Sequence, residues 1–245
     1  MEIGPTMQNH ERILVALDTP SITKACYILD IAGDYIGGIK LGLEFFNHNG
    51  VIGVNKVTGR MDTKLFLDLK FHDISNTVAG AVRGIISTQP HIINVHTAGG
   101  YDMMKKAKLQ ALESAEQFGM TSPLVIGVTV LTALDDADLK AVGYANNAKE
   151  QVVIMAKLAK DAGLDGVVCS AHEIKAIKET CGKAFITVVP GIRPDGANKG
   201  DQKRTMTSAQ AIAEGADYIV IGRPITEAED ILAAAKEIAE SVNAI

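Results

Sequence analysis

The sequence predicts a single (β/α)8 TIM barrel, an α/β fold in which eight parallel strands form a closed sheet. Eight short apolar runs alternate with longer amphipathic stretches along the whole chain. Strict alternation of this kind is typical of a parallel sheet. Eight strand–helix units in 245 residues fit the size of one closed barrel. A doubly wound open sheet is the structural alternative.

The expected strands are the apolar runs at 13–18, 38–43, 65–70, 92–97, 124–131, 166–169, 185–190 and 218–222. Amphipathic stretches at 101–118, 147–162 and 226–242 predict helices. Capping boxes predict three helix starts, at Ser170 with Glu173, Thr207 with Gln210, and Thr226 with Glu229. No Pro/Gly/Ser-rich linker divides the chain. We therefore expect one barrel domain, 12–245, after an N-terminal tail, 1–11.

Composition excludes several classes of partner. The net charge of −5 disfavours broad contacts with nucleic acid or a membrane surface. No apolar run approaches the roughly 20 residues that span a bilayer. The three cysteines match neither a zinc site nor a CxxC motif, and the histidines have no metal-ligand spacing. These observations predict a cytoplasmic protein with reduced thiols and no metal site.

Polar residues interrupt one face of four consecutive strands. In 65–70, one face carries only leucines, whereas the other carries Phe66, Asp68 and Lys70. The continuous apolar face suits contact with helices, so the second face is expected to point into the barrel. By this rule six polar residues lie near the carboxyl ends of the strands: Asp18, Lys40, Asp68, Lys70, Asn94 and His96. That end is the catalytic end of such barrels, although a structural ion-pair network is the alternative.

Two loops have the character of a phosphate site. The segment 190–204, after the seventh strand, is rich in glycine and basic residues, and Gly222-Arg223 follows the eighth strand. Barrels commonly bind phosphate with these two loops. Glycine permits close approach of the main chain, and arginine offers paired donors to phosphate oxygens. The alternative is a solvated surface loop. The set predicts an enzyme acting on a small phosphorylated metabolite.

The segment LFLDLKFHDISNTV, 65–78, resembles the signature of orotidine 5'-monophosphate (OMP) decarboxylases. Its core is D-x-K-x-x-D-I-x-x-T. Further blocks agree in order: VALD at 15–18, IKLGLEFF at 39–46, VTVLT at 128–132, and VVPGIR, GDQKR and YIVIGRPIT between 188 and 226. The resemblance covers nearly the whole chain from about residue 12. The GDQKR and GRPIT blocks separate this family from related sugar-phosphate barrels.

The resemblance implies decarboxylation of OMP to UMP and CO2, in UMP biosynthesis, without a cofactor. Lys70 is the implied proton donor, and it forms a catalytic charge array with Lys40, Asp68 and Asp73. A homodimer is implied, in which Asp73, Ile74 and Thr77 complete the partner's site. The implied substrate contacts are Asp18 and Lys40 to ribose, Thr132 to the pyrimidine, and Arg193, Gln202, Gly222 and Arg223 on the phosphate side.

Two other functions stay open at this point. A related sugar-phosphate decarboxylase or aldolase would need a divalent metal, for which Glu44 and Asp68 are the candidate ligands. A catalytically inactive phosphoribosyl-ligand binding protein would need the phosphate loops but not Lys70 or Asp73.

Overall fold

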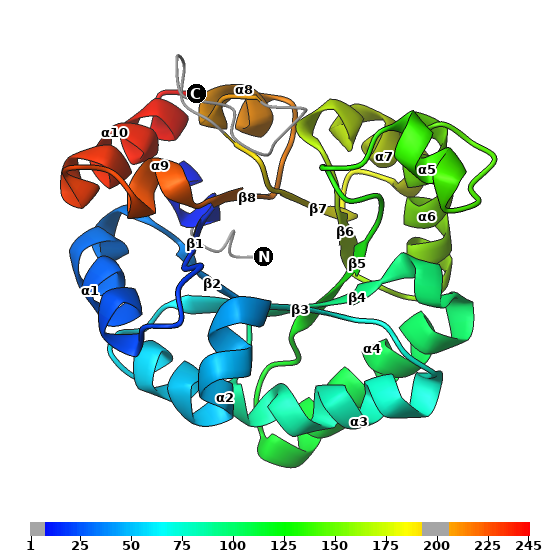
Figure 1. Ribbon diagram of the computed structural model, residues 1–245, viewed down its shortest axis with the longest axis horizontal. Coiled ribbons are helices and arrows are strands. Elements are labelled where there is room, and N and C mark those ends of the chain that lie inside the picture. Colours follow the sequence, from blue (N-terminus) through cyan, green and yellow to red (C-terminus); the bar gives the residue numbers. More distant parts are fainter. Residues whose placement is uncertain (1–7, 193–205) are drawn as a thin grey trace, which may run out of the picture.

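The computed structural model describes residues 8–192 and 206–245. Within these ranges the strands are parallel and pair in chain order, and β8 pairs with β1. The sheet is therefore a closed barrel (Figure 1), as the sequence predicts. The strands are β1 (Ile13–Ala16), β2 (Gly38–Gly42), β3 (Lys64–Phe71), β4 (Ile92–His96), β5 (Leu124–Val128), β6 (Gly166–Val168), β7 (Ile186–Val189) and β8 (Tyr218–Ile221).

Helices surround the barrel (Figure 1). The α-helices are α1 (Ile22–Ala32), α2 (Leu43–Thr58), α3 (Ser75–Ile85), α4 (Tyr101–Phe118), α5 (Asp136–Ala141), α6 (Ala148–Asp161), α7 (Ile174–Cys181), α8 (Ser208–Ala213), α9 (Arg223–Thr226) and α10 (Ile231–Asn243). Short 3-10 turns are η1 (Asn9–Arg12), η2 (Gly33–Tyr35), η3 (Ile86–Thr88), η4 (Thr97–Gly99) and η5 (Ala171–Glu173). In the described part of the chain, no helix combines the length and apolar character needed to cross a membrane.

The core has two layers, which follow from the alternation of side chains along each strand. Ile13, Val15 and Leu17 belong to the large cluster between the strands and the helices. Leu14 and Ala16 belong to a smaller cluster inside the barrel. Both faces of a parallel sheet are thus covered. In the same way Leu65 and Leu67 of β3 face the helices and Phe66 faces inward, which confirms the predicted faces. The polar positions of β2 and β3 are therefore on the inner face.

Two of the three predicted helix starts are confirmed. Thr207 and Gln210 form a capping box at the start of α8. At Ser170 the main-chain N–H donates to Glu173 Oε2 at 2.8 Å, at the start of η5, which leads into α7. The third prediction is wrong. Thr226 ends the short helix α9 rather than starting a long one. Pro224 suits the first turn of a helix and starts α9 early. The carboxylate of Asp230 then accepts from the Ala233 amide at 2.9 Å and caps α10.

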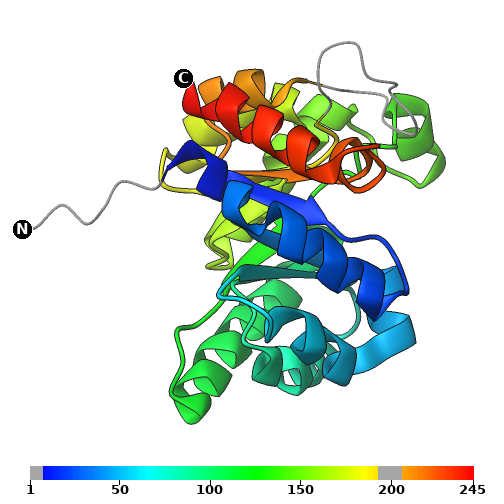
Figure 2. The ribbon, with the colours of Figure 1, turned by 90° about the vertical axis from the view of Figure 1, so that its left-hand side faces the viewer.

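The ring of helices closes where the two ends of the chain meet. Helices α10 and α1 run side by side (Figure 2). Asn9 Nδ2 donates to the Val242 carbonyl at 2.9 Å, and the His10 amide donates to Asn243 Oδ1 at 3.0 Å. Of the expected tail, 1–11, residues 1–7 lie outside the described residues, and η1 begins at Asn9.

At the amino-terminal ends of the strands, aspartates join neighbouring strands. Asp217 Oδ2 accepts from the Thr187 amide at 2.7 Å and from Lys178 Nζ at 2.6 Å. Asp165 makes the same kind of contacts at the start of β5. These contacts stabilise the end of the barrel opposite the polar cluster, which leaves the carboxyl ends free to form a site.

Candidate active site

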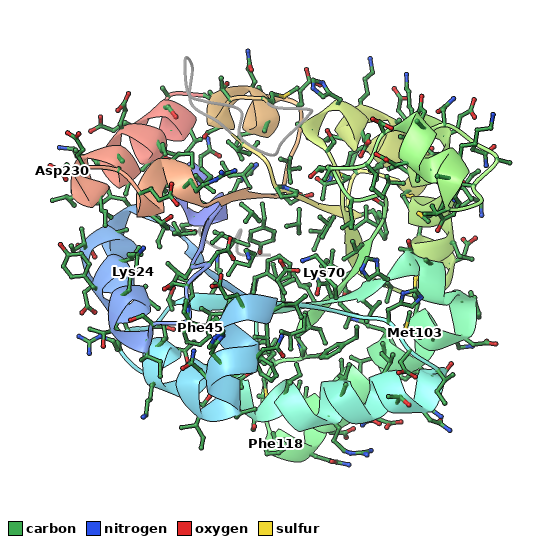
Figure 3. All side chains as sticks on the ribbon, in the orientation of Figure 1. Lys24, Phe45, Lys70, Met103, Phe118 and Asp230 are labelled. Atoms are coloured by element: carbon green, nitrogen blue, oxygen red, sulfur yellow. The ribbon has the colours of Figure 1, made fainter. Side chains whose placement is uncertain are left out.

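A pocket of ≈ 560 Å³ opens at the carboxyl ends of the strands. Its lining comes from the ends of β1, β2 and β3, from β5 to β8, and from the loops that follow them. Lys70 lies within the ring of strands, whereas Lys24 and Asp230 lie on the outer edge of the molecule (Figure 3). The sequence-predicted inner charges Asp18, Lys40, Asp68 and Lys70 all line this pocket.

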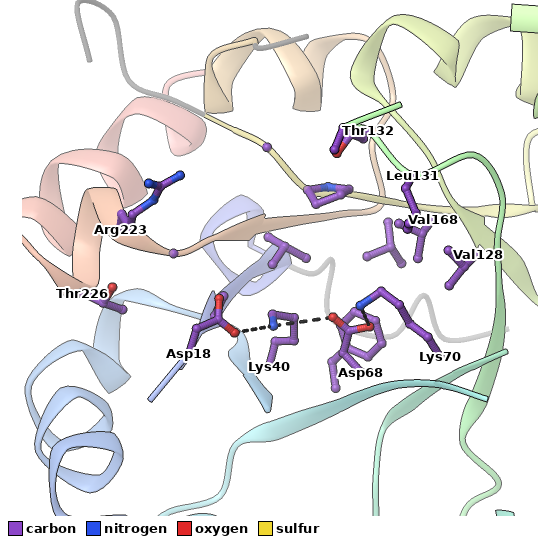
Figure 4. A pocket seen from close by; sticks show the side chains of 18 of the residues that line it. Asp18, Lys40, Asp68, Lys70, Val128, Leu131, Thr132, Val168, Arg223 and Thr226 are labelled. Atoms are coloured by element: carbon purple, nitrogen blue, oxygen red, sulfur yellow. Dashed lines mark hydrogen bonds and ion pairs between the residues drawn. The ribbon is translucent and has the colours of Figure 1, made fainter. Parts of the chain in front are cut away.

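Charges of alternating sign cross one wall of the pocket (Figure 4). Lys40 Nζ lies 2.9 Å from Asp18 Oδ1 and 3.5 Å from Asp68 Oδ2. Lys70 Nζ lies 2.7 Å from Asp68 Oδ1. The side chains of Lys40 and Asp68 are 10% and 11% exposed, and that of Asp18 is 61% exposed. Lys40 and Asp68 therefore lie in a nearly dry interior, where charges interact strongly. They stand between Asp18 and the Lys70 side chain, which is 30% exposed.

Asp68 stays ionised in this interior because cations surround it. Burial by itself would raise the pKa of Asp68. The charges of Lys40 and Lys70, and hydrogen bonds from Lys70 and Asn94, outweigh burial and hold that pKa below its ordinary value. Asp68 is thus a fixed anion that locates two ammonium groups.

The main chain at Lys70 departs from regular strand geometry. Lys70 has φ 49°, in the left-handed region that non-glycine residues seldom adopt. The β3–β4 register skips between Leu67 and Phe71, which marks a bulge or irregularity there. Bulges commonly redirect a side chain next to an active site. Here the irregularity includes Asp68 and Lys70, the two charges at the inner end of the array.

The opposite wall of the pocket is apolar. Val128, Val168 and Val188 line it from β5, β6 and β7, and Leu131 lines it from the loop after β5. Figure 4 shows Val128, Leu131 and Val168. Thr132, a sequence-predicted contact, also lines the pocket from the loop after β5. The pocket thus sets an apolar wall against a charged one, which suits a ligand with apolar faces and polar edges.

The structure describes part of the side that the sequence predicts for phosphate binding. Gly222 and Arg223, two of the residues predicted for that side, line the pocket. Figure 4 places Arg223 and Thr226 toward Asp18 and away from Lys70. Arg193 and Gln202, predicted for the same side, lie outside the described residues. The described geometry separates a cationic group on the rim from the ammonium of Lys70, so a ligand with an anionic tail has a defined direction.

Three sequence-predicted residues do not line the pocket of their own chain. Asp73, Ile74 and Thr77 lie at the start of α3 and are exposed. Ile74 is 72% exposed, which is unusual for a large apolar side chain next to a functional strand. Within one chain, these residues therefore lie outside the pocket that Lys70 lines.

His96 also lies apart from the pocket lining. Its ring centroid is 5.4 Å from that of His72, because the register shift places Phe71 beside Val95 and brings the next residue of each strand together. Burial, then His72 and Lys70, hold the pKa of His96 below its ordinary value. Asn94, which the sequence predicts to face inward but to which it assigns no role, contacts both Asp68 and Lys70.

Among the described residues, no group of three or more His, Cys, Asp or Glu side chains is arranged to hold a metal ion. Glu44, the candidate ligand of the metal-dependent alternative, is exposed in the first turn of α2 and does not line the pocket.

The fold and site define a (β/α)8-barrel protein with a pocket at the carboxyl ends of its strands, lined by charges of both signs. Residues 11–238 match the model of the orotidine 5'-phosphate decarboxylase / HUMPS family. The chain belongs to this family.

Named relatives and a solved structure resemble nearly the whole chain. It is 46% identical over 240 residues to the orotidine 5'-phosphate decarboxylase of Moorella thermoacetica, a match covering 98% of this chain and 95% of that protein. It is 48% identical over 230 residues to the protein of that name from Rhodospirillum rubrum, and the match covers 94% of this chain and 93% of that protein. The crystal structure of orotidine 5'-phosphate decarboxylase from Lactobacillus acidophilus superposes with a TM-score of 0.83 at 36% identity, covering 94% of this chain and 98% of that one.

Proposed function

We propose that the protein is an orotidine 5'-monophosphate decarboxylase, a carboxy-lyase that converts OMP into UMP and CO2 in de novo pyrimidine biosynthesis. Family membership and the names of its relatives support this reaction. The observation that carries the proposal is the ammonium of Lys70, held 2.7 Å from Asp68 on a wall that faces an apolar surface. A fixed cation there stabilises negative charge that develops on a bound ring.

The pocket suggests one direction for the substrate. The phosphate binds at Gly222 and Arg223, with Arg193 and Gln202 as further donors. The ribose hydroxyls meet Asp18 and Lys40, which lie 2.9 Å apart between the rim and the interior. A carboxylate accepts from hydroxyl groups and an ammonium donates to them, so the pair suits a diol.

The pyrimidine then lies between the apolar wall and Lys70, near Thr132. In the reaction the bond between C6 and the carboxylate carbon breaks, and CO2 leaves. The electron pair of that bond stays on C6. The Lys70 ammonium gives its proton to C6, which yields UMP and a neutral amine that solvent reprotonates. Atoms and electrons balance in this step without a redox partner. Because the Lys70 ammonium stabilises the charge that develops on C6, we propose that the reaction needs neither a cofactor nor a metal.

Asp68 contributes to this step in two ways. It anchors Lys70 Nζ at 2.7 Å, which prepays the ordering of a long flexible side chain. It also places a negative charge near the substrate carboxylate, and that repulsion disappears when neutral CO2 forms. The effect is strong because the Asp68 side chain is only 11% exposed.

We also propose a homodimer in which Asp73, Ile74 and Thr77 complete the partner's site. All three are exposed and lie outside the pocket of their own chain. In a mixture, Lys70→Ala and Asp73→Ala subunits form heterodimers in which one site contains neither change. We expect each variant to be nearly inactive alone and the mixture to recover activity. No recovery after demonstrated subunit exchange would contradict a shared site.

We place the enzyme in the cytoplasm. Cys26, Cys169 and Cys181 form no disulfide with one another, as a reducing compartment favours.

An ultraviolet assay of OMP consumption tests the proposed reaction. We expect the wild-type protein to consume OMP at the same rate with and without EDTA. Loss of activity in EDTA that magnesium restores would support a metal-dependent sugar-phosphate enzyme instead. A folded protein that binds UMP but leaves OMP intact would support an inactive phosphoribosyl-ligand binding protein.

A further inference from the structure

One amide side chain joins the two inner charges of the pocket from the neighbouring strand. Asn94 lies in β4 and is 0% exposed. Its Nδ2 donates to Asp68 Oδ1 at 2.7 Å. Its Oδ1 accepts from the main-chain amide of Lys70, also at 2.7 Å. Only one orientation of the amide satisfies both contacts, because the carboxylate only accepts and the main-chain N–H only donates.

The position of this bridge coincides with the irregularity in β3. The register runs through Leu67↔Ile93 and resumes at Phe71↔Val95, so Lys70 lies where the pairing skips. Lys70 also has φ 49°, a conformation that persists only where the surroundings hold it. The Asn94 carbonyl oxygen binds the main-chain N–H of this same residue. Asn94 therefore holds the part of the main chain that aims the lysine.

The second contact of Asn94 holds the anchor of the ammonium. Asp68 Oδ1 accepts from Asn94 Nδ2 and from Lys70 Nζ, each at 2.7 Å. The Asn94 donor thus fixes the rotamer of the carboxylate that Lys70 binds. One buried amide therefore positions Lys70 twice: it binds the main-chain N–H of Lys70 directly, and it holds the carboxylate that binds the Lys70 ammonium.

We propose that Asn94 is a positioning residue that sets where the Lys70 ammonium stands relative to the reacting carbon of the substrate. This inference rests on the proposed decarboxylase function. Asn94 acts through Lys70 and Asp68, and it does not itself line the pocket. Its loss should therefore slow the chemical step and leave ligand affinity nearly unchanged, whereas an amide that only fills the core would affect stability alone.

The first test compares Asn94→Ala with the wild type and with Thr97→Val. Thr97 is also buried, and its Oγ1 donates to the Val128 carbonyl at 2.9 Å, so Thr97→Val is a matched loss of a buried hydrogen bond. We expect Asn94→Ala to lower kcat by about 100-fold, as misplacement of a reacting group by about 1 Å does. KM and the Kd of UMP should change by less than about threefold. Thr97→Val should keep wild-type kcat.

Asn94→Asp separates the two contacts and guards against a folding defect in the alanine variant. An ionised carboxylate at this position still accepts from the Lys70 amide but repels Asp68. A protonated one can donate to Asp68 and accept from Lys70, as the amide does. We therefore expect the activity of Asn94→Asp, relative to wild type, to rise as pH falls. A ratio independent of pH would contradict the contact with Asp68.

A double-mutant cycle with Lys70→Ala decides whether Asn94 acts through Lys70. Single turnovers at high enzyme concentration measure the residual rates. We expect Asn94→Ala to change the rate by less than about threefold once Lys70 is alanine, because residues that act as a unit are not additive. A full 100-fold effect in that background would overturn the proposal, and so would wild-type kcat in folded Asn94→Ala. If the wild type itself leaves OMP intact, the proposed function fails instead.

Discussion

Lys40→Met removes the central cation of the charge array and replaces the aliphatic stem of lysine with an unbranched apolar side chain of similar length. Lys40 Nζ contacts Asp18 at 2.9 Å and Asp68 at 3.5 Å, and its side chain is 10% exposed. Methionine fills the space of the aliphatic stem, so packing changes little. The perturbation therefore acts mainly on Asp68, which stays buried and loses one of its two cations.

The size of the effect follows from this burial. Removal of one partner of a buried ion pair destabilises a protein by about 3–5 kcal/mol. Asp68 keeps the Lys70 ammonium and the Asn94 amide, so we expect a destabilisation at or just below the lower limit of this range, about 2–3 kcal/mol at pH 7. Loss of a charged contact to the substrate should also lower kcat/KM by about 10- to 150-fold, which corresponds to about 1.5–3 kcal/mol.

The pH dependence carries a defined sign. In the wild type, Lys40 and Lys70 outweigh burial and hold the Asp68 pKa below its ordinary value of 3.8. The stability that this carboxylate contributes is present above pH 3.8 and is lost as pH falls through its folded-state pKa. Without Lys40 the folded-state pKa rises, so protonation relieves the unpaired charge sooner. The stability difference between variant and wild type should therefore narrow as pH falls from 7 toward 4.

Urea unfolding of both proteins between pH 4 and pH 8 measures this difference. A constant difference across the range would refute the assigned role of Lys40 in keeping Asp68 ionised. Equal free energies of unfolding for Lys40→Met and wild type at pH 7 would refute the expected destabilisation.

Three further changes test other parts of the molecule. Burial holds the pKa of His91 below its ordinary 6.5, and its Nε2 lies 3.0 Å from the Tyr218 hydroxyl. The stability that neutral His91 contributes to the fold is therefore lost as pH falls below 6.5. In thermal melts, the difference in Tm between wild type and His91→Gln should shrink between pH 7 and pH 5. A Tm difference that does not change with pH would contradict this role of His91. Asp217→Ala leaves the buried Thr187 amide without its acceptor, so urea unfolding should find a loss of about 1–3 kcal/mol with kcat unchanged; a large drop in kcat would contradict the separation of the two barrel ends. Arg223→Ala should raise KM by about tenfold or more through loss of a charged phosphate contact, and an unchanged KM would remove Arg223 from the phosphate site.

The barrel could be predicted because its pattern is local. Alternation along 65–70 separates leucines from Phe66, Asp68 and Lys70, and the closed sheet follows from eight such units. The charges of the array lie together for the same reason, since the carboxyl ends of parallel strands meet at one end of a barrel.

The parts that escaped prediction depend on contacts between strands. The bulge at Lys70 is set by the register of β3 against β4, which no single strand encodes. Asn94 was predicted to face inward, but its two contacts follow from that irregular register. The same shift places His96 beside His72 and away from the pocket lining. The helix start predicted at Thr226 is wrong because Pro224 suits the first turn of a helix, so the short helix α9 already begins at Arg223 and ends at Thr226.

The central claim is that Lys70, held by Asp68 on the inner wall of the barrel, protonates the substrate as CO2 leaves. The most direct measurement is the rate of OMP decarboxylation by wild type and Lys70→Ala, with the Kd of UMP measured for both. We predict rapid turnover by the wild type, a rate lower by at least about 10²–10⁴-fold in Lys70→Ala, and UMP binding by both proteins. Decarboxylation by folded Lys70→Ala at a rate near that of the wild type would contradict the account.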